Sequence, residues 1–216
     1  MKHATSLLTL IATTLMTTCT LHAEEALSPI ALKAPDLERP ASLMQAFSKR
    51  ASSLEVEDRM LSIQDLSDLL WAANGVNRPE EKKRTAPSAV NAQDVDIYVF
   101  LAEGAYLYDA FENVLKPVVK GDFRAQLISQ PHPVPPVLLF LVCDISRFTR
   151  ITDDAARRNL AAMDAGIVSQ NIAIFCAGSG MATRPRAMMN TERLKDVLKL
   201  SDTQIPVLNN PVGYQK

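Results

Sequence analysis

Residues that commonly carry acid–base or nucleophilic catalysis are scarce in this sequence. It contains three histidines, and His132 is the only one outside the first 22 residues. This scarcity argues against a nucleophile triad and excludes a histidine-rich metal site. Carboxylates lie close together in "EVED" (55–58) and "TDD" (152–154), but their polar neighbours indicate solvent-exposed charges. We therefore expect no catalytic side chain and no metal ligands.

The segment "TAPSAVNAQD", residues 85–94, offers a different kind of chemistry. Pro87 restricts the backbone, while Ser88 and Asn91 supply hydrogen-bond donors and acceptors. One interpretation is a simple turn before a strand. The other is the polar edge of a site for a cofactor, such as a flavin, that carries out the chemistry itself. The glycines of "GSG" (178–180) are a weak phosphate signal, and we interpret them as a helix stop.

The first 23 residues resemble a secretory signal peptide. Lys2 precedes an apolar run, Leu7–Met16, which is too short to span a bilayer, and small residues then lead to a cleavage site after Ala23. A buried N-terminal helix and a lipoprotein anchor at Cys19 are the alternatives. Threonine precedes that cysteine, which disfavours the anchor. The pattern predicts a periplasmic or secreted protein with no stable membrane span.

The remainder of the chain suits a single domain. Residues 24–41 are polar with three prolines and are expected to form a flexible lead-in, and residues 42–216 are long enough for one sizeable core. Two β-rich runs around Glu103-Gly104 predict a hairpin, so we expect an antiparallel sheet and the α+β class. Helices are predicted at 42–50, 62–74, 122–130, 153–178 and 191–200, and strands at 97–101, 105–108, 137–143 and 205–216.

Local signals place several helix ends. Ser62 is the expected N-cap of the second helix, with Asp65 in the capping-box position, and Asn74-Gly75 ends it. Asp122 and Thr191 are the expected starts of two short helices. In the first helix, Leu43, Ala46 and Phe47 share one face, which predicts burial of that face.

The net charge bears on nucleic-acid binding, and the cysteines bear on a possible disulfide. The formal net charge is −1, and no basic stripe marks a nucleic-acid surface. Cys143 and Cys176 both lie in apolar runs. Two buried thiols are the favoured interpretation, although export would also permit a disulfide between them.

Five segments occur in a fixed order along the chain: "LSDLLWAANGVNR", "RTAPSAVNAQ", "IYVFLAEGAYLYD", "DAGIVSQNIAIFCAGSGM" and "PVGY". Together they resemble the nitroreductase family of flavoproteins. The second motif is similar to a subgroup pattern R-T-A-P-S-A-x-N-x-Q. The similarity runs from about Arg50 to Tyr214, and each motif is weak alone while their order and spacing are more specific.

The resemblance implies a fold, an assembly and a cofactor. It implies a homodimer of α+β subunits, each with a helix-wrapped antiparallel sheet, and two FMN molecules at the subunit interface. The long helix at 153–178 would form much of the dimer core. The reaction would move two electrons from a reduced nicotinamide to an electron-poor acceptor such as a nitroaromatic or a quinone.

The resemblance also assigns FMN-binding positions. Arg50 and Ser52 match the family's phosphate-binding stretch, whereas Ala51 and Leu54 replace cations and predict a weaker phosphate clamp. Lys216 is a further possible phosphate ligand.

Two other segments match flavin-binding positions. Pro87, Ser88 and Asn91 match the motif beside the flavin ring. Arg186, Ala187 and Met188 fall where a backbone amide of the family reaches the ring.

Two functional hypotheses follow. The first is an exported FMN-dependent oxidoreductase whose electrons come from NAD(P)H or from a redox partner protein. The second is a non-enzymatic module, either flavin-binding or cofactor-free, that keeps the fold with a weakened phosphate clamp.

Overall fold

The computed structural model describes residues 26–128 and 133–216. The predicted signal peptide (1–23) and His132 lie outside the described residues. The helices are α1 Leu43–Lys49, α2 Ile63–Asn74, η1 Ala89–Asn91, α3 Arg124–Leu127, η2 Ile145–Arg147, α4 Asp154–Gly178 and α5 Thr191–Leu198. The strands are β1 Ile30–Ala31, β2 Val76–Arg78, β3 Lys83–Arg84, β4 Val95–Phe100, β5 Gly104–Asp109, β6 Val114–Lys120, β7 Val137–Asp144, β8 Met181–Thr183 and β9 Gln204–Tyr214.

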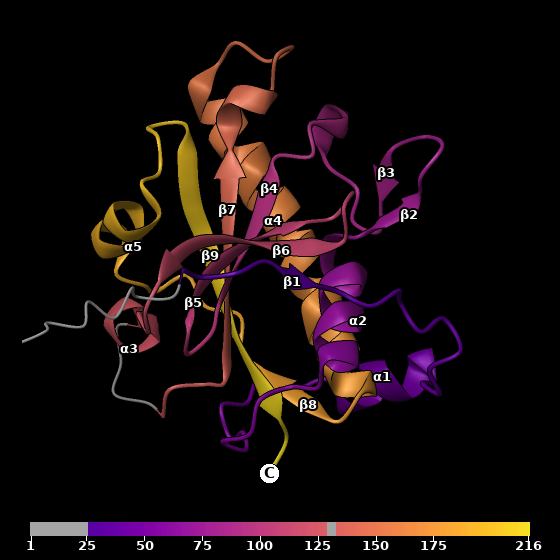
Figure 1. Cartoon of the computed structure of the whole chain (residues 1–216). Helices are drawn as coiled ribbons and strands as arrows, with labels where there is room; N and C mark the ends of the chain where they lie inside the picture. The colour runs from indigo at the N-terminus through magenta and orange to yellow at the C-terminus, as the bar shows by residue number, and fades with distance from the viewer. Residues whose placement is uncertain (1–25, 129–132) are drawn as a thin grey trace, which may run out of the picture.

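An antiparallel sheet forms the middle layer of the subunit. Its strand order is β1-β6-β5-β4-β7-β9-β8, and every neighbouring pair is antiparallel. Helices α2 and α4 lie on one side of the sheet and the short helices α3 and α5 on the other (Figure 1). The predicted α+β class and helix-wrapped antiparallel sheet are therefore confirmed.

Side chains of the central strands point alternately to the two faces of the sheet, and they form a hydrophobic core on each side. Strand β7 is buried along seven of its eight residues, "VLLFLVC", and its side chains point to both faces in turn. Leu139 and Leu141 join the larger core under α2 and α4. Leu138 and Phe140 join the smaller core under α5, where Phe140 meets Phe100 edge to face. A continuous apolar run thus becomes a strand that is buried on both sides.

The predicted N-cap and stop of α2 are confirmed, but the capping box does not form, because the Ser62 amide donates to the Tyr214 hydroxyl rather than to the Asp65 carboxylate. The Ser62 hydroxyl accepts a hydrogen bond from the Asp65 amide at 3.0 Å, which caps the first turn. Gly75 ends the helix, and a Cβ at this position would lie 2.5 Å from the Trp71 ring. Glycine is therefore required there by close packing.

Other expectations need correction. Helix α1 forms as predicted, but Leu43 and Phe47 are 64% and 51% exposed and only Ala46 is buried, because α1 contacts α4 through this small side chain. Asn190 rather than Thr191 caps α5, since its side chain accepts from the Arg193 amide.

Three further elements differ from the expectation. Helix α3 begins at Arg124, and Asp122 accepts from the Arg124 amide without being its N-cap. Strand β6 was not predicted, because Pro117 interrupts its pattern. The pairing of β5 with β6 shifts register beside this proline, which lets the strand tolerate it. Residues 76–84, where no strand was predicted, contain the β2–β3 ribbon.

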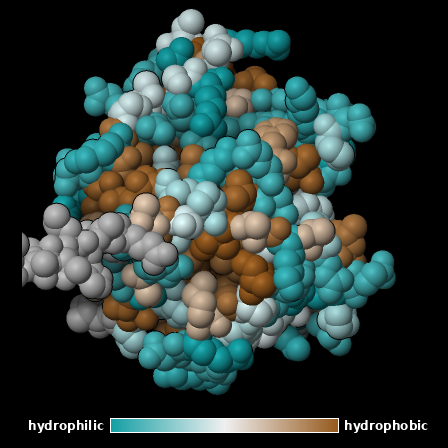
Figure 2. All heavy atoms as spheres, viewed as in Figure 1, coloured by the Kyte–Doolittle hydropathy of each residue, from teal (hydrophilic) through white to brown (hydrophobic). Residues whose placement is uncertain are grey.

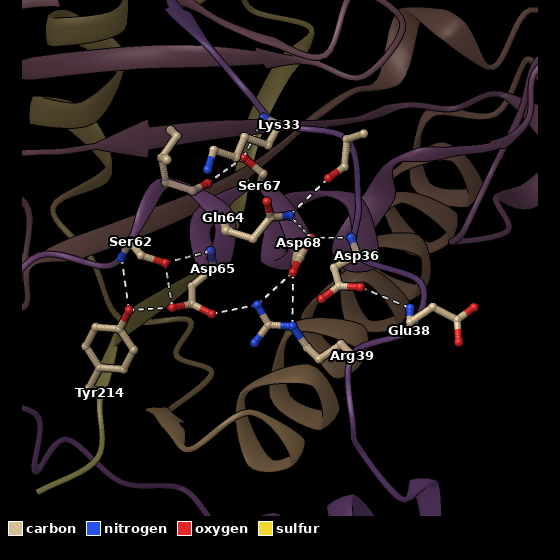
Figure 3. A network of polar contacts seen from close by, with 12 residues as sticks. Lys33, Asp36, Glu38, Arg39, Ser62, Gln64, Asp65, Ser67, Asp68 and Tyr214 are labelled. Atoms are coloured by element: carbon tan, nitrogen blue, oxygen red, sulfur yellow. Dashed lines mark hydrogen bonds and ion pairs between the residues drawn. The ribbon is translucent and has the colours of Figure 1, made fainter.

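The lead-in, expected to be flexible, is docked where the structure describes it. Strand β1 pairs with β6, and the Asp36 amide donates to Asp68 of α2. Arg39 then bridges two acidic residues of α2, with Nη2 at 2.6 Å from Asp65 and 2.7 Å from Asp68 (Figure 3). Tyr214, at the end of β9, donates to Asp65 as well. One polar network therefore joins the lead-in, α2 and the last strand.

We predict that Asp68→Ala lowers the free energy of unfolding by about 3 kcal/mol, because it leaves the half-buried Arg39 guanidinium without its main partner. The Asp68 side chain is 4% exposed. Urea denaturation followed by circular dichroism measures the change. The matched control is Asp154→Ala, whose partner Arg158 is 53% exposed, and this variant should lose less than about 0.5 kcal/mol. Equal losses for the two variants would contradict the importance of the network.

Candidate functional site

The loop at residues 87–93 has an unusual backbone. Val90, Asn91 and Gln93 have φ angles of 48°, 55° and 48°, in the left-handed region that glycine normally occupies. Val90 is β-branched, so this conformation is especially costly. Strained backbone that persists in this way clusters at functional sites, provided that surrounding contacts hold it.

Hydrogen bonds within the loop hold part of this conformation. The Ser88 hydroxyl accepts from the Gln93 amide at 2.8 Å, and the Asn91 amide donates to the Ser88 carbonyl at 3.0 Å. Ser88 therefore shapes the loop directly, while its own O–H remains available as a donor. Pro87, Val90 and Asn91 are exposed at the surface. The predicted ring-binding motif is thus a locked loop with an outward-facing polar edge.

Other elements fasten the loop from outside. The Ala89 amide donates to Oδ2 of Asp164 in α4 at 2.8 Å. The Gln93 side chain accepts from Arg84 at 3.0 Å, and Arg147 donates to the Gln93 carbonyl at 2.8 Å. These contacts come from β3, η2 and α4, so the rest of the fold determines the loop conformation.

Two buried carboxyl groups lie beneath the loop. Asp94 is fully buried, and among the described residues both of its carboxyl oxygens lack a hydrogen-bond partner when the group is ionised. Burial, followed by hydrogen bonding and charge from Asp164, raises the pKa of Asp94 to about 7. The sequence interpretation did not single out either residue, because they are 70 positions apart and only the fold brings them together.

The predicted phosphate-binding residues lie elsewhere. Ser52 forms an isolated parallel bridge with Thr183 of β8, and Arg50 directly follows α1 and is exposed. An open hollow of about 430 Å³ lies beside Ser52, and Arg184 and Lys216 line it. The remaining lining residues are Ser53, Leu54, Glu55, Val56 and Pro133. Arg184 was missed by the sequence interpretation, which looked for cations at 51 and 54.

Arg186, Ala187 and Met188 form the segment after β8. Arg186 exchanges backbone hydrogen bonds with Asn209 of β9, and its Nε donates to the Asn209 side chain at 3.1 Å. Burial lowers the pKa of Arg186, and the charge of Arg184 lowers it further. Its buried Nη2 lacks a partner among the described residues, whereas Ala187 and Met188 are exposed. This segment supplies a fixed guanidinium near the hollow.

These residues lie at two separate places along α4. The 87–93 loop is attached to Asp164 near the middle of the helix, while Lys49, Ala51 and Ser53 line a small cavity with β8 and with Cys176, near the C-terminal end of the helix. The 12 helical residues from Asp164 to Cys176 span roughly 18 Å at about 1.5 Å each. A single chain therefore brings together Ser52, Arg184 and Arg186 but does not bring the loop to them.

Large apolar side chains are exposed on helices α1 and α4. Leu43, Met44 and Phe47 of α1 and Met163 and Ile167 of α4 are all exposed. Next to α1, an apolar cavity of about 250 Å³ is lined by residues that include Trp71 and Phe175. Hydrophobic residues also reach the surface in several areas of the face shown in Figure 2. Such patches are typical of surfaces that meet another protein.

The described residues contain two cysteines and no cluster of possible metal ligands. Cys143 and Cys176 are both buried and free, which confirms the favoured interpretation of two buried thiols. Within residues 26–128 and 133–216, no group of three or more His, Cys, Asp or Glu side chains is placed to hold a metal ion. One described helix, α4, is long and apolar enough to cross a membrane by length and composition, but it packs against α1, α2 and the sheet as a core helix.

Comparison with known proteins identifies the class. A family model described as Nitroreductase family matches residues 47–214, which is most of the chain. The chain therefore belongs to the nitroreductase family, and it is an oxidoreductase. Members of this family generally bind a flavin, FMN, use NAD(P)H and form dimers. The family predicted from the motif order is confirmed.

Solved structures agree with this assignment. A protein from Ralstonia eutropha described as a nitroreductase is 30% identical, with a TM-score of 0.81, and the match covers 87% of this chain and 90% of that chain. A nitroreductase family protein of Streptococcus pneumoniae is 17% identical, with a TM-score of 0.59, over 81% and 91% of the two chains. A chain of the E. coli microcin synthetase complex is 16% identical, with a TM-score of 0.68, over 97% and 85%. The last two show the fold alone. Among curated proteins, none matches this chain.

We predict that Val90→Asn raises the free energy of unfolding by about 1 kcal/mol, because asparagine tolerates the left-handed backbone better than valine. Val90 is 56% exposed, so little packing is lost. Urea denaturation measures the effect. Val118→Asn, in strand β6 and 40% exposed, is the control and should not stabilise the protein. A loss of stability in Val90→Asn equal to that in the control would mean that the loop is not strained.

Proposed function

We propose that this protein is an exported FMN-dependent oxidoreductase. It transfers two electrons from NAD(P)H or a redox partner protein to a nitroaromatic, a quinone or a similar small acceptor. The observation that carries the proposal is the locked loop at 87–93, where three left-handed residues accompany Ser88 and the exposed Asn91 at the motif expected beside the flavin ring. The order and spacing of the family motifs support the same assignment.

The donor groups beside Ser52 fit a phosphate. The hydroxyls of Ser52 and Ser53 and the cations of Arg184 and Lys216 line one hollow, with Glu55 as the opposing charge. Charged donors and hydroxyls are the groups that bind a phosphate dianion well. Arg184 therefore replaces, from another element, a cation that is absent at positions 51 and 54. Arg50 lies at the end of α1 as an exposed additional cation.

The remaining residues would hold the ring and shape its surroundings. Ser88 and Asn91 would offer polar atoms from the locked loop, and the Arg186–Met188 segment would offer backbone amides and one buried guanidinium. When bound, FMN supplies hydride and electron transfer itself, so the protein needs no acid–base pair. The chain's own residues bind and orient the flavin, which agrees with the scarcity of catalytic side chains.

We further propose that the functional unit is a homodimer. Asp164, which anchors the loop, and Cys176, which lies in the small cavity beside Ser53 and Thr183, are roughly 18 Å apart along α4. In the proposed dimer, the loop of one copy would therefore face the hollow of the other. The exposed apolar residues of α1 and α4 support such contact, because pairing would remove them from water. A cavity beside α1 gives the same surface further apolar area.

Export rests on the sequence of residues 1–23, with its short apolar run and cleavage site. A protein outside the cytoplasm does not meet free NAD(P)H, so a redox partner is the donor that best fits this location. Size-exclusion chromatography and determination of the mature N-terminus test the assembly and the processing.

We predict that Arg184→Ala weakens FMN binding about tenfold, because a charge-assisted contact to the phosphate is lost. Riboflavin, which lacks the phosphate, should bind the variant as well as it binds the wild-type protein. Arg50→Ala should also weaken FMN binding and leave riboflavin binding unchanged. Quenching of flavin fluorescence gives each dissociation constant.

The matched control is Arg158→Ala on α4, which removes an exposed cation paired with Asp154. It should leave the affinities for both flavins unchanged. Equal loss of FMN and riboflavin affinity in Arg184→Ala would reject the phosphate role, and Asn91→Ala without any loss of riboflavin affinity would reject the ring role of the loop.

A further inference from the structure

We propose that Asp94 and Asp164 share one proton and act together as positioning residues for the flavin-binding loop, so that flavin affinity falls when this proton is lost. The inference rests on the proposed role of residues 87–93 in binding the ring. Both residues act through the backbone of Ala89 rather than by contacting the flavin.

Asp164 is the anchor of the loop. Its side chain lies on the buried face of α4, is 3% exposed, and accepts the Ala89 amide at 2.8 Å. Ala89 opens the turn η1, so this contact fixes the point from which Val90 and Asn91 enter their left-handed conformations. Without the acceptor, a backbone N–H in the loop would lose its partner, and the strained turn would relax.

Asp94 is the second member of the pair. It follows the loop directly, is fully buried, and has two carboxyl oxygens without a partner in its ionised form. Its backbone carbonyl accepts from the Asp144 amide at 2.9 Å, which keeps the residue against β7. Two ionised carboxylates cannot be neighbours in a buried site without a large cost. A proton on Asp94 turns this repulsion into a hydrogen bond, in which Asp94 donates and Asp164 accepts.

Groups on two other elements face Asp94. From β7, the Cys143 thiol donates to the Ala161 carbonyl at 3.3 Å, and burial together with the charge of Asp94 raises the pKa of the thiol. Hydrogen bonding from this thiol lowers the pKa of Asp94, but burial and Asp164 raise it more. From η2, Arg147 pairs with Asp96 at 2.6 Å, and its charge also acts on Asp94.

Loss of the shared proton therefore occurs near neutral pH. Burial and Asp164 raise the pKa of Asp94 from 3.8 to about 7. The folded protein thus keeps this proton while the unfolded chain releases it, so the free energy of unfolding falls as pH rises from 3.8 towards 7. Above that range Asp94 carries a negative charge beside Asp164, and this charge acts on the acceptor that holds Ala89.

The test is the affinity of the full chain for riboflavin and FMN at pH values about one unit below and about one unit above the pKa of Asp94. We expect wild-type affinity for both flavins to fall about tenfold across this interval. Riboflavin has no phosphate to titrate, so a fall for this ligand reports on the ring site. Asp94→Asn should bind both flavins equally at the two pH values, because its amide donates to Asp164 as the protonated acid does. Asp154→Asn, on the exposed side of the same helix, should keep the wild-type fall.

The variant Asp164→Ala tests the anchoring of the Ala89 amide separately from the protonation of Asp94. We expect it to bind riboflavin about tenfold more weakly at both pH values, since the amide of Ala89 has lost its acceptor. Constant wild-type affinity across the interval, or a fall of the same size in Asp94→Asn, would overturn the proposal.

A second measurement needs no flavin. The amide resonance of Ala89 in the flavin-free protein should shift with pH around the pKa of Asp94 in the wild type and stay constant in Asp94→Asn. If the resonance shifts while flavin affinity does not, the pair exists but does not position the loop, and the proposal fails while the flavin site stands. If the wild-type protein binds neither flavin at any pH, the proposed function fails with it, and the resonance still shows whether the proton is shared.

Discussion

One buried face of α4 holds this structure together. Its small residues, among them Ala161 and Ala165, let the helix lie close to the sheet, and the Cys143 thiol reaches the Ala161 carbonyl. The same face carries two buried polar groups. Ser169 donates to Asn210 of β9 at 2.9 Å, and Asp164 accepts from Ala89 in the loop. The packing that builds the core therefore also fixes the candidate site, which is why a strained loop survives at the surface.

The arrangement of the site follows from the length of this helix. The loop is attached at Asp164, near the middle of α4, whereas the hollow lined by Arg184 and Lys216 is formed by residues outside this helix. In the proposed function, each subunit would therefore supply two separate parts of a site. The apolar residues left exposed on α1 and α4 lie on the elements that a second copy would cover. In this account, dimer formation and flavin binding are parts of one process, and neither needs a catalytic side chain.

Strong local signals made much of the fold predictable. The cap and stop of α2, the β4–β5 hairpin, the apolar strand β7 and the full length of α4 each follow from a short stretch of sequence. Strand β6 was missed because Pro117 hides its alternation. The predicted burial of the α1 face was wrong because Ala46 is the only buried residue of this helix.

The candidate site could be predicted only in part, because several of its contacts join residues that are far apart in the sequence. The motif order indicated the loop, but Arg184 reaches the phosphate hollow from another element, and Asp94 meets Asp164 across 70 residues. Contacts between distant residues leave no pattern in a single sequence.

The most direct test of the central claim is the visible absorption spectrum of the purified full chain after incubation with FMN and removal of unbound flavin. We predict a yellow protein with one FMN per subunit, whose flavin absorbance is bleached by dithionite and restored by an electron acceptor. A colourless protein that retains no added FMN would contradict the account.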